Sequence, residues 1–194
     1  MSGLEDFARL VGGDHGLCVV STSRPDGTIQ SSVVNAGVLP HPVTGAQVVG
    51  LVSRGDAYRV ANLRARPRAS VVIRAGWEWA GVEGPVELAG PDDPMPGVDA
   101  ERLRLLLREI FTAAGGTHDD FGTYDRVMAG ERRLAVLVTP ADQADDLGPC
   151  HRMREHARVD HRRLDRAVRP RRGHHAQAVI TADQPGEVLE SAHG

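Results

Sequence analysis

The sequence has 194 residues, enough for one domain of ordinary size with a real hydrophobic core. Its formal net charge of −3 gives no electrostatic reason to expect a nucleic-acid partner. The first residues are too few and too acidic for a secretory signal, and no apolar run approaches the length that spans a bilayer. We therefore expect a cytoplasmic protein with neither a nucleic-acid nor a membrane partner.

The cysteines and histidines do not form the patterns of a stabilising cross-link or a metal centre. Cys18 lies inside an apolar run and Cys150 in a polar segment far along the chain, so neither a disulfide framework nor a zinc site is predicted. His151, His156 and His161 recur every five residues, a spacing that points successive side chains of a helix to different faces. We expect no metal site.

Aromatic residues divide the chain into two parts. All seven lie in the first 125 positions, whereas six of the nine histidines follow residue 140. A segment without aromatic residues and with few branched apolar ones cannot bury enough surface to offset the entropy of ordering it. We predict a folded domain at 1–140 and a flexible, Arg- and His-rich C-terminal tail at 141–194. Either a genuine extension or an altered reading frame of GC-rich DNA would produce such a tail.

Apolar residues at helical spacing predict a short helix at 4–11. Runs of alternating or continuous apolar residues then predict six strands, at 16–23, 29–39, 47–53, 69–75, 77–88 and 133–139. Further helices are predicted between the third and fourth strands and, at 98–114 and 121–129, before the last strand. Connections of hairpin length join most of the strands. We therefore expect a small antiparallel barrel with helices at its ends, and not a parallel doubly wound sheet.

Two of the predicted strands carry features that bear on where they lie. The strand at 47–53 is almost continuously apolar, which indicates burial on both faces. In the strand at 77–88, Pro85 cannot donate a ladder hydrogen bond, so we expect an edge or a bulge there. Trp77 and Trp79 occupy alternate positions and should lie on one side. They either pack in the core, where large aromatics are more often found, or form one wall of a flat-ring pocket.

The segment 53–75 gathers six arginines around the short helix between two strands. Asp56 is placed to cap that helix, and Pro67 ends it because proline disfavours the α region for the residue before it. A helix start flanked by arginines suits a phosphate or carboxylate ligand. Alternatively, these arginines are simply solvated, because arginine is the only basic residue of this chain apart from histidine.

Common nucleotide and hydrolase motifs are absent from the sequence. No G-x-G-x-x-G follows a strand, and neither a G-x-x-x-x-G-K-[ST] loop nor a G-x-S-x-G elbow is present. A Rossmann-type nucleotide site is therefore not expected.

Three short motifs stand in the order that the predicted elements give them: N-L-R-x-x-P-R-A-S at 62–70, the Gly76-Trp77 pair, and V-E-G at 82–84. Together they resemble the pyridoxamine 5'-phosphate oxidase-like split β-barrel family over residues 4–139. Within it, the sequence looks most like the branch that binds the deazaflavin coenzyme F420. The resemblance implies a mainly β, α+β fold: a six-stranded antiparallel split β-barrel with short helices, of the FMN-binding split-barrel type.

The resemblance also implies a homodimer with a flavin or deazaflavin in a groove at its interface. Carried over by position, the candidate cofactor-binding residues are Gln30, Ser32, Ser53, Arg54, Arg59 and Asn62, and the position of Trp77 in the sequence adds it to them. The first two would lie beside the ring system or its ribityl chain, the next four would hold the phosphate, and the tryptophan is the candidate wall of the ring pocket. Arg59 stands where a lysine is usual, which keeps the charge but changes its geometry. Ala61 stands where another basic residue is common, which removes one phosphate contact.

The function expected from this resemblance is that of an F420-dependent oxidoreductase, in which reduced deazaflavin donates a hydride to a small organic acceptor. No side chain stands out as a catalytic acid, and the sequence identifies neither the acceptor nor the proton donor. Two alternatives stay open. One is an FMN-binding protein of the same family, and the other is a non-catalytic carrier or binding protein for F420.

Overall fold

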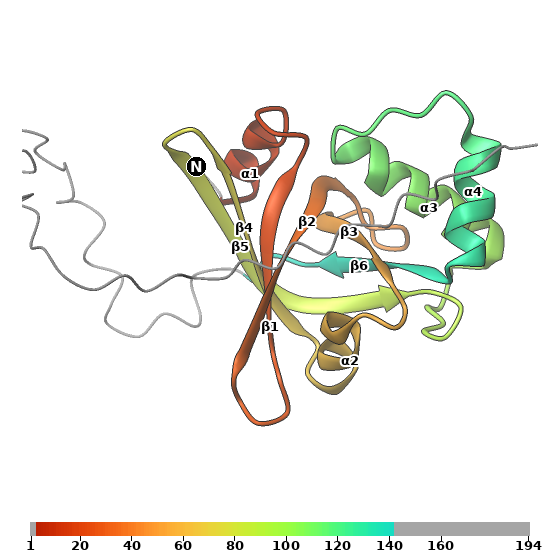
Figure 1. Ribbon diagram of the computed structural model, residues 1–194, viewed down its shortest axis with the longest axis horizontal. Helices are drawn as coiled ribbons and strands as arrows, with labels where there is room; N and C mark the ends of the chain where they lie inside the picture. The colour runs from red at the N-terminus through yellow and green to blue at the C-terminus, as the bar shows by residue number, and fades with distance from the viewer. Residues whose placement is uncertain (1–2, 142–194) are drawn as a thin grey trace, which may run out of the picture. The chain divides into compact units, whose positions relative to one another are not determined.

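The computed structural model describes residues 3–141 (Figure 1). In this part of the chain the helices and strands are α1 (Gly3–Val11), β1 (Leu17–Ser23), β2 (Ile29–Pro40), β3 (Gln47–Arg54), α2 (Tyr58–Ala65), β4 (Arg68–Ala75), β5 (Glu78–Ala89), α3 (Ala100–Ala113), α4 (Phe121–Gly130) and β6 (Arg133–Val138). Every helix and strand predicted from the sequence is confirmed, with small differences at the ends. Apart from Ala141, the predicted tail, with Cys150 and its histidines, lies outside the described residues.

The six strands close into an antiparallel barrel in the order β1-β2-β3-β6-β5-β4, which confirms the predicted fold class. Two long strands each serve both halves of the barrel. β2 pairs with β1 from Ile29 to Asn35 and then with β3 from Ala36 to Pro40. β5 pairs with β4 as far as Pro85 and from there on with β6. Because both strands change partner midway, the barrel is split between its two halves.

Pro85 stands at the point where β5 changes partner, so the predicted edge or bulge was wrong. The register runs through Pro85 without an extra residue. Its carbonyl accepts a hydrogen bond from the Thr139 amide at 3.0 Å, and the Val86 amide donates to the carbonyl of Pro67 at 2.9 Å. The missing N–H of the proline falls just before the first residue that β5 pairs with β6. A closed barrel can accept a proline there without giving up a ladder bond.

Two apolar clusters hold the fold together. One fills the barrel interior, where α1 contributes Phe7 and α2 contributes Val60 and Leu63, all completely or almost completely buried. The other lies between the outside of β3 and β6 and the helices α3 and α4, and it includes Leu106 and Ile110. The residues of β6 alternate between the two clusters and are all buried after Arg133. β3 is buried on both faces for the same reason, as its continuous apolar run predicts.

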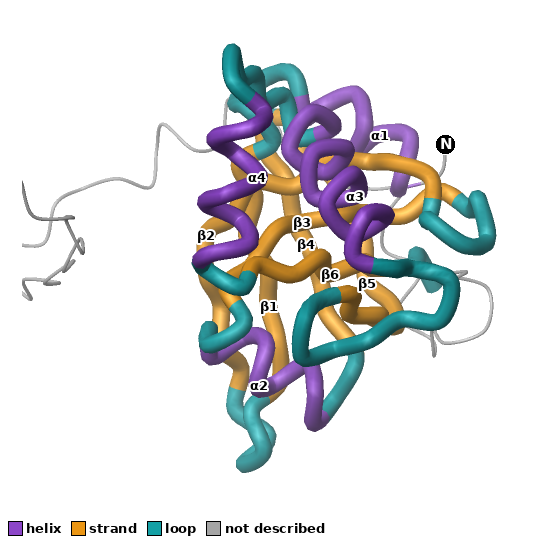
Figure 2. The backbone as a smooth tube through the Cα atoms, turned by 90° about the vertical axis from the view of Figure 1, so that its right-hand side faces the viewer, coloured by secondary structure: helices purple, strands orange, loops and turns teal. Residues whose placement is uncertain are grey.

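The helices take different places around the barrel. Figures 1 and 2 show α1 and α2 at opposite ends of it, while α3 and α4 lie side by side along its wall. Gly37 on β2 lets α3 approach closely, since a Cβ at this glycine would overlap the backbone of Ala113 and Ala114. Within the described residues, no helix is long and apolar enough to cross a membrane.

The glycine of the V-E-G motif has a specific structural reason. After β6 the chain continues beside β5, where the Ala141 amide donates to the carbonyl of Glu83 at 2.9 Å. A Cβ at Gly84 would overlap the carbonyl oxygen of Thr139. Only glycine therefore lets residues 139–141 lie against β5.

Candidate functional site

Beyond the stretch over which β2 and β3 pair, the two strands separate and leave an opening in the barrel wall. β3 leaves β2 after Leu51 and continues against β6 alone to Arg54, while the first half of β2 pairs only with β1. A cavity of about 360 Å³ lies beside this opening and reaches under α3 and α4. We call it the split cleft. Its walls include Val33, Val34, Val52, Arg59, Phe111 and Arg133.

The short helix α2, which carries Arg59, begins differently from the prediction. Its N-cap is Ala57 and no side chain caps it, so the assignment of Asp56 as the cap was wrong. The Asp56 carboxylate instead accepts a hydrogen bond from Arg54 at 2.8 Å. The ion pair with Arg54 therefore takes the place of the predicted helix cap. The helix ends at Ala65, two residues before Pro67, as predicted.

The six arginines of segment 53–75 turn out to be unequal. Five of them have polar partners: the carboxylates of Asp56, Asp93 and Glu83 for Arg54, Arg64 and Arg68, and backbone carbonyls for Arg66 and Arg74. Arg59 is the exception, because it is half-buried and makes no hydrogen bond or ion pair with any described residue. Of the six arginines in this segment, Arg59 is therefore the candidate for the predicted anion site.

A second cation, Arg133 at the start of β6, lines the same cleft. Its guanidinium is anchored by the carboxylate of Glu131, which accepts from Nε at 2.7 Å. Burial lowers the pKa of Arg59, and the positive charge of Arg133 lowers it further. Arg59 nevertheless remains cationic at neutral pH, because the ordinary pKa of arginine is so high. The cleft thus holds two positive charges, and Arg59 has no counter-charge among residues 3–141.

Tyr124 on α4 also lines the split cleft, but its hydroxyl is already engaged. It donates to the backbone carbonyl of Leu107 at 3.1 Å, and burial raises the pKa of the phenol to about 12. The ring packs against Phe111 with centroids 5.0 Å apart. Tyr124 is therefore a neutral structural residue that joins α4 to α3.

Of the predicted site residues, Gln30 and Asn62 are joined through Thr22. The Asn62 amide donates to the Thr22 hydroxyl at 3.0 Å, and that hydroxyl donates to the Gln30 side-chain oxygen at 3.3 Å. Asn62 and Thr22 are both buried, so these two hydrogen bonds connect α2 to β1 and β2. The Asn62 amide nitrogen is thus already used within the fold.

The two predicted serines lie beside the split, one on each strand. Ser32 lies on the same face of β2 as Val34, which lines the cleft. Its Oγ is buried and has no hydrogen-bond partner in the described part of the chain. Ser53 is also buried, and its Oγ makes one long hydrogen bond, of 3.4 Å, to the carbonyl of Arg54. An unpaired buried hydroxyl is uncommon, and a water molecule or a ligand would supply the missing partner.

Trp77 lies at the far end of the barrel from α2. It is 100% exposed in the turn between β4 and β5, and Trp79 is 64% exposed, so core packing of the two indoles was wrong. The β4–β5 hairpin projects beyond the barrel, and α1 covers only one side of it, where Arg9 pairs with Glu78. Seven residue steps along β4, or roughly 23 Å, separate this turn from the α2 end of the strand. Within one chain, Trp77 does not join the other predicted site residues.

Sequence reasoning missed Arg133, Phe111 and the rest of the wall that α3, α4 and β6 supply. An Arg-Arg pair before a strand is typical of a solvated turn, and alternation along β6 does not tell which helix will cover it. The long-range pairing of β6 with the end of β3 brings Arg133 to the same cleft as Arg59. No local signal in the sequence would have identified it.

An exposed apolar row crosses four strands next to the cleft. Val33, Val19, Val72 and Gly81 are successive cross-strand partners on β2, β1, β4 and β5. The three valines are 61%, 41% and 40% exposed. We call these four residues the valine row. Val33 also lines the split cleft, so the row begins where the cleft opens.

No protein-family model matches the sequence, and no curated protein does. Among solved structures, the conserved hypothetical protein Rv2991 from Mycobacterium tuberculosis is similar at a TM-score of 0.50 and 21% identity, over 72% of this chain and 81% of that protein. An F420 reductase is similar at 0.46 and 16%, over 69% and 91%. A pyridoxamine 5'-phosphate oxidase-related, FMN-binding protein from Nostoc punctiforme PCC 73102 is similar at 0.48 and 13%, over 71% and 76%.

The likeness to the Mycobacterium tuberculosis protein is one of fold. The strand order, and the change of partner along β2 and β5, identify the fold independently of these comparisons. The described part of the chain is a six-stranded antiparallel split β-barrel with short helices.

Proposed function

We propose that the protein is an F420-dependent oxidoreductase that binds the deazaflavin in the split cleft and transfers a hydride between it and a small organic acceptor. The observation that carries the proposal is Arg59, a half-buried guanidinium without a counter-charge in the described structure. A cation withdrawn from water is costly unless an anion accompanies it. With Arg133 in the same cleft, the cost is greater, and a bound phosphate would offset it.

The residues of the cleft fit a ligand that has both a phosphate and a flat ring. Arg59 would hold the phosphate, with Arg54 and Ser53 at the end of β3 as its neighbours in the chain. The unpaired Ser32 hydroxyl can donate to an oxygen of the ring or the ribityl chain. The apolar side chains of the cleft wall suit the ring, since cofactor pockets are mostly apolar with a few polar groups that fix orientation.

Two further candidates would act less directly. Asn62 would orient Gln30 through Thr22, which leaves the Gln30 amide nitrogen to face the ligand apart from a long, 3.5 Å contact with the Ser31 carbonyl. Trp77 is too far from the cleft of its own chain. If it walls the ring, it does so in a homodimer, from the partner copy.

When bound, reduced deazaflavin supplies the hydride, and the protein supplies binding, orientation and exclusion of water. Burial raises the pKa of the Cys18 thiol to about 12, and Tyr124 is likewise held neutral, so neither side chain is a suitable acid near pH 7. We therefore assign no catalytic side chain, and solvent water would protonate the reduced acceptor.

The proposed assembly is a homodimer in which a second copy covers the valine row. Adjacent exposed valines on a regular sheet face are more than a monomer needs to leave in water. Because Val33 belongs to both the row and the cleft wall, a copy seated there would border the cleft. The cofactor groove would then lie at the dimer interface.

A fluorescence titration of the full chain with oxidised F420, run in parallel with FMN, tests the proposal. Arg59→Ala should weaken F420 binding by tenfold or more, which corresponds to about 1.4 kcal/mol for the loss of a charge-assisted contact. Arg126→Ala is the matched control, because Arg126 is exposed on α4, donates to the Thr123 hydroxyl and does not line the split cleft. Its F420 affinity should equal that of the wild type.

Each other outcome has a definite meaning. Tighter binding of FMN than of F420 would make the protein an FMN-binding member of this fold class. Binding of F420 without oxidation of its reduced form by a panel of quinones, enones and nitroaromatics would indicate a carrier. Binding of neither cofactor, or equal losses in the Arg59 and Arg126 variants, would contradict the proposal.

A further inference from the structure

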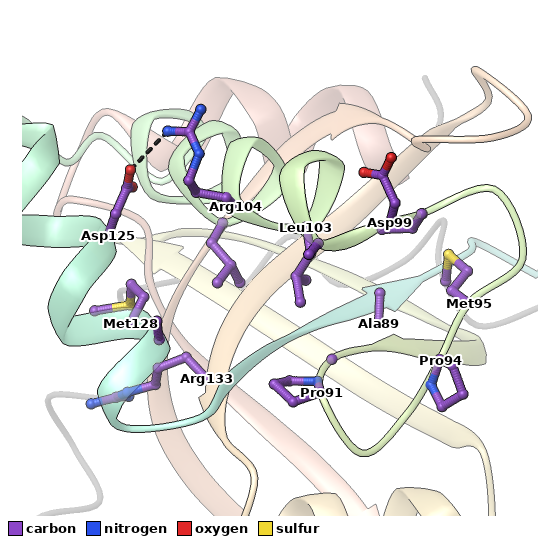
Figure 3. A pocket seen from close by; sticks show the side chains of 15 residues that line it. Ala89, Pro91, Pro94, Met95, Asp99, Leu103, Arg104, Asp125, Met128 and Arg133 are labelled. Atoms are coloured by element: carbon purple, nitrogen blue, oxygen red, sulfur yellow. Dashed lines mark hydrogen bonds and ion pairs between the residues drawn. The ribbon is translucent and has the colours of Figure 1, made fainter.

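A second cavity, of about 370 Å³, lies between α3, α4 and the loop that follows β5 (Figure 3). We call it the loop pocket, and its walls include Ala89, Pro91, Met95, Leu103, Leu107 and Met128. It shares two lining residues, Met128 and Arg133, with the split cleft. These two side chains therefore belong to the wall between the two cavities.

The lining of the loop pocket is mostly apolar. In Figure 3 the Leu103 side chain points from α3 toward Ala89 and Pro91, which belong to the end of β5 and the loop after it. Met95 is buried at the loop side, and Leu107 is buried beneath α3. Two proline rings and two thioether side chains give this surface a shape that aliphatic or aromatic groups can fill.

Every charged side chain at the pocket already has a partner. Arg104 donates to Asp125 at 2.7 Å and also pairs with Glu101, and Asp125 pairs in addition with Arg108. Asp99 caps α3 by accepting from the Arg102 amide at 2.8 Å. Arg133 is held by Glu131. An anion entering this pocket would lose its hydration without gaining a free counter-charge, because both lining arginines are paired with carboxylates.

The loop that closes the pocket is fastened at several points. Gly90 and Asp93 exchange two backbone hydrogen bonds, of 2.9 and 3.1 Å. The Asp93 carboxylate accepts a bidentate pair from Arg64 of α2, at 2.8 and 2.7 Å, and Asp92 pairs with Arg132. The wall is thus preformed, and the loop does not need to order itself around a ligand.

We propose that the loop pocket binds an uncharged, apolar small molecule, such as an aromatic or alicyclic compound. A preformed apolar cavity of this volume falls within the size range of small-molecule sites. Its lining gains dispersion contacts when it is filled. The pairing of its arginines with carboxylates selects against anions. This inference does not depend on the function proposed for the split cleft.

The test uses the full chain and the uncharged fluorescent probe N-phenyl-1-naphthylamine. We expect saturable binding with a stoichiometry of one probe per chain. Ala129→Leu adds a branched side chain to the pocket wall from α4, keeps a strong helix former, and should weaken the probe by fivefold or more. Val127→Leu on the same helix is the control, because Val127 is exposed and does not line the pocket. Leu103→Phe provides a second, independent filling variant should Ala129→Leu fold poorly.

Competition identifies the ligand class. Uncharged 2-naphthol should displace the probe at least tenfold more effectively than the 2-naphthoate anion, and equal or better displacement by the anion would overturn the proposal. Absence of saturable binding would also overturn it, and would fit a pocket already filled by another part of this chain. Trp79→Ser tests the exposed sheet face, and a loss of probe binding there but not in the filling variants would place the probe outside the pocket.

Discussion

The split cleft and the loop pocket have nearly the same volume and share Met128 and Arg133, yet they differ in how their charges are satisfied. In the split cleft, the half-buried Arg59 has no partner among the described residues. In the loop pocket, the carboxylates and guanidiniums at the rim are paired with one another or with backbone. The comparison teaches that the balance of charge, more than size or shape, indicates which class of ligand each cavity would hold.

The largest effect should come from the valine row, which borders only one of the two cavities. Val19→Glu would place a charge between Val33 and Val72 and should weaken self-association at least a hundredfold, because a carboxylate buried without a partner opposes dimer contact. Sedimentation velocity measures this change. F420 affinity should fall along with the dimer, while probe binding in the loop pocket stays the same.

Val127→Glu is the control, since Val127 is comparably exposed but lies on α4. A wild-type chain that sediments as a monomer at high micromolar concentration would contradict the assembly. So would an association that survives Val19→Glu.

A smaller effect is expected at the charge network beside the loop pocket. Arg108 and then Arg104 lower the pKa of Asp125, so this carboxylate contributes stability above its unfolded pKa, and the contribution is lost as the pH falls through its folded pKa. Asp125→Asn should lower the free energy of unfolding by about 1–3 kcal/mol at pH 7. The difference from wild type should shrink as the pH is lowered below 4. Urea unfolding at a series of pH values measures it, and a difference that does not change with pH would contradict the assignment.

Loss of one contact that holds the pocket loop should lower the affinity of the loop pocket for the probe by a factor of a few. Arg64→Gln removes the bidentate partner of Asp93 and should weaken the probe in the loop pocket by about threefold to fivefold, because the loop must then be ordered on binding. Arg54→Gln is matched to it, since that variant breaks an exposed ion pair with Asp56 that does not touch the pocket. An unchanged probe affinity in Arg64→Gln would show that the loop needs no such anchor.

The smallest expected effect is a gain in stability. Without a cofactor, Arg59→Met should raise the free energy of unfolding by roughly 0.5–1 kcal/mol, because it removes a half-buried cation that faces Arg133 and keeps the aliphatic stem. The same substitution should abolish any stabilisation that added F420 gives. Thermal unfolding with and without F420 separates the two effects. A destabilised apo protein would mean that Arg59 has a structural partner.

Local patterns in the sequence were sufficient for the helices and strands and for their arrangement in a barrel. The continuous apolar run of β3 predicted burial on both faces, and Pro67 predicted the end of α2. These properties depend on neighbours in the chain, on hydrophobic periodicity and on backbone sterics, so a sequence can report them.

Tertiary structure decided everything that depends on which side chains meet. Asp56 pairs with Arg54 and does not cap α2 as the sequence predicted. Pro85 stands where β5 changes its partner from β4 to β6. The tryptophans lie on a hairpin that projects past the core. Six arginines looked alike in the sequence, and packing left only Arg59 half-buried with no partner among the described residues. Long-range contacts set the cost of burying each charge, and for that reason the sequence alone could suggest an anion site but not identify its residue.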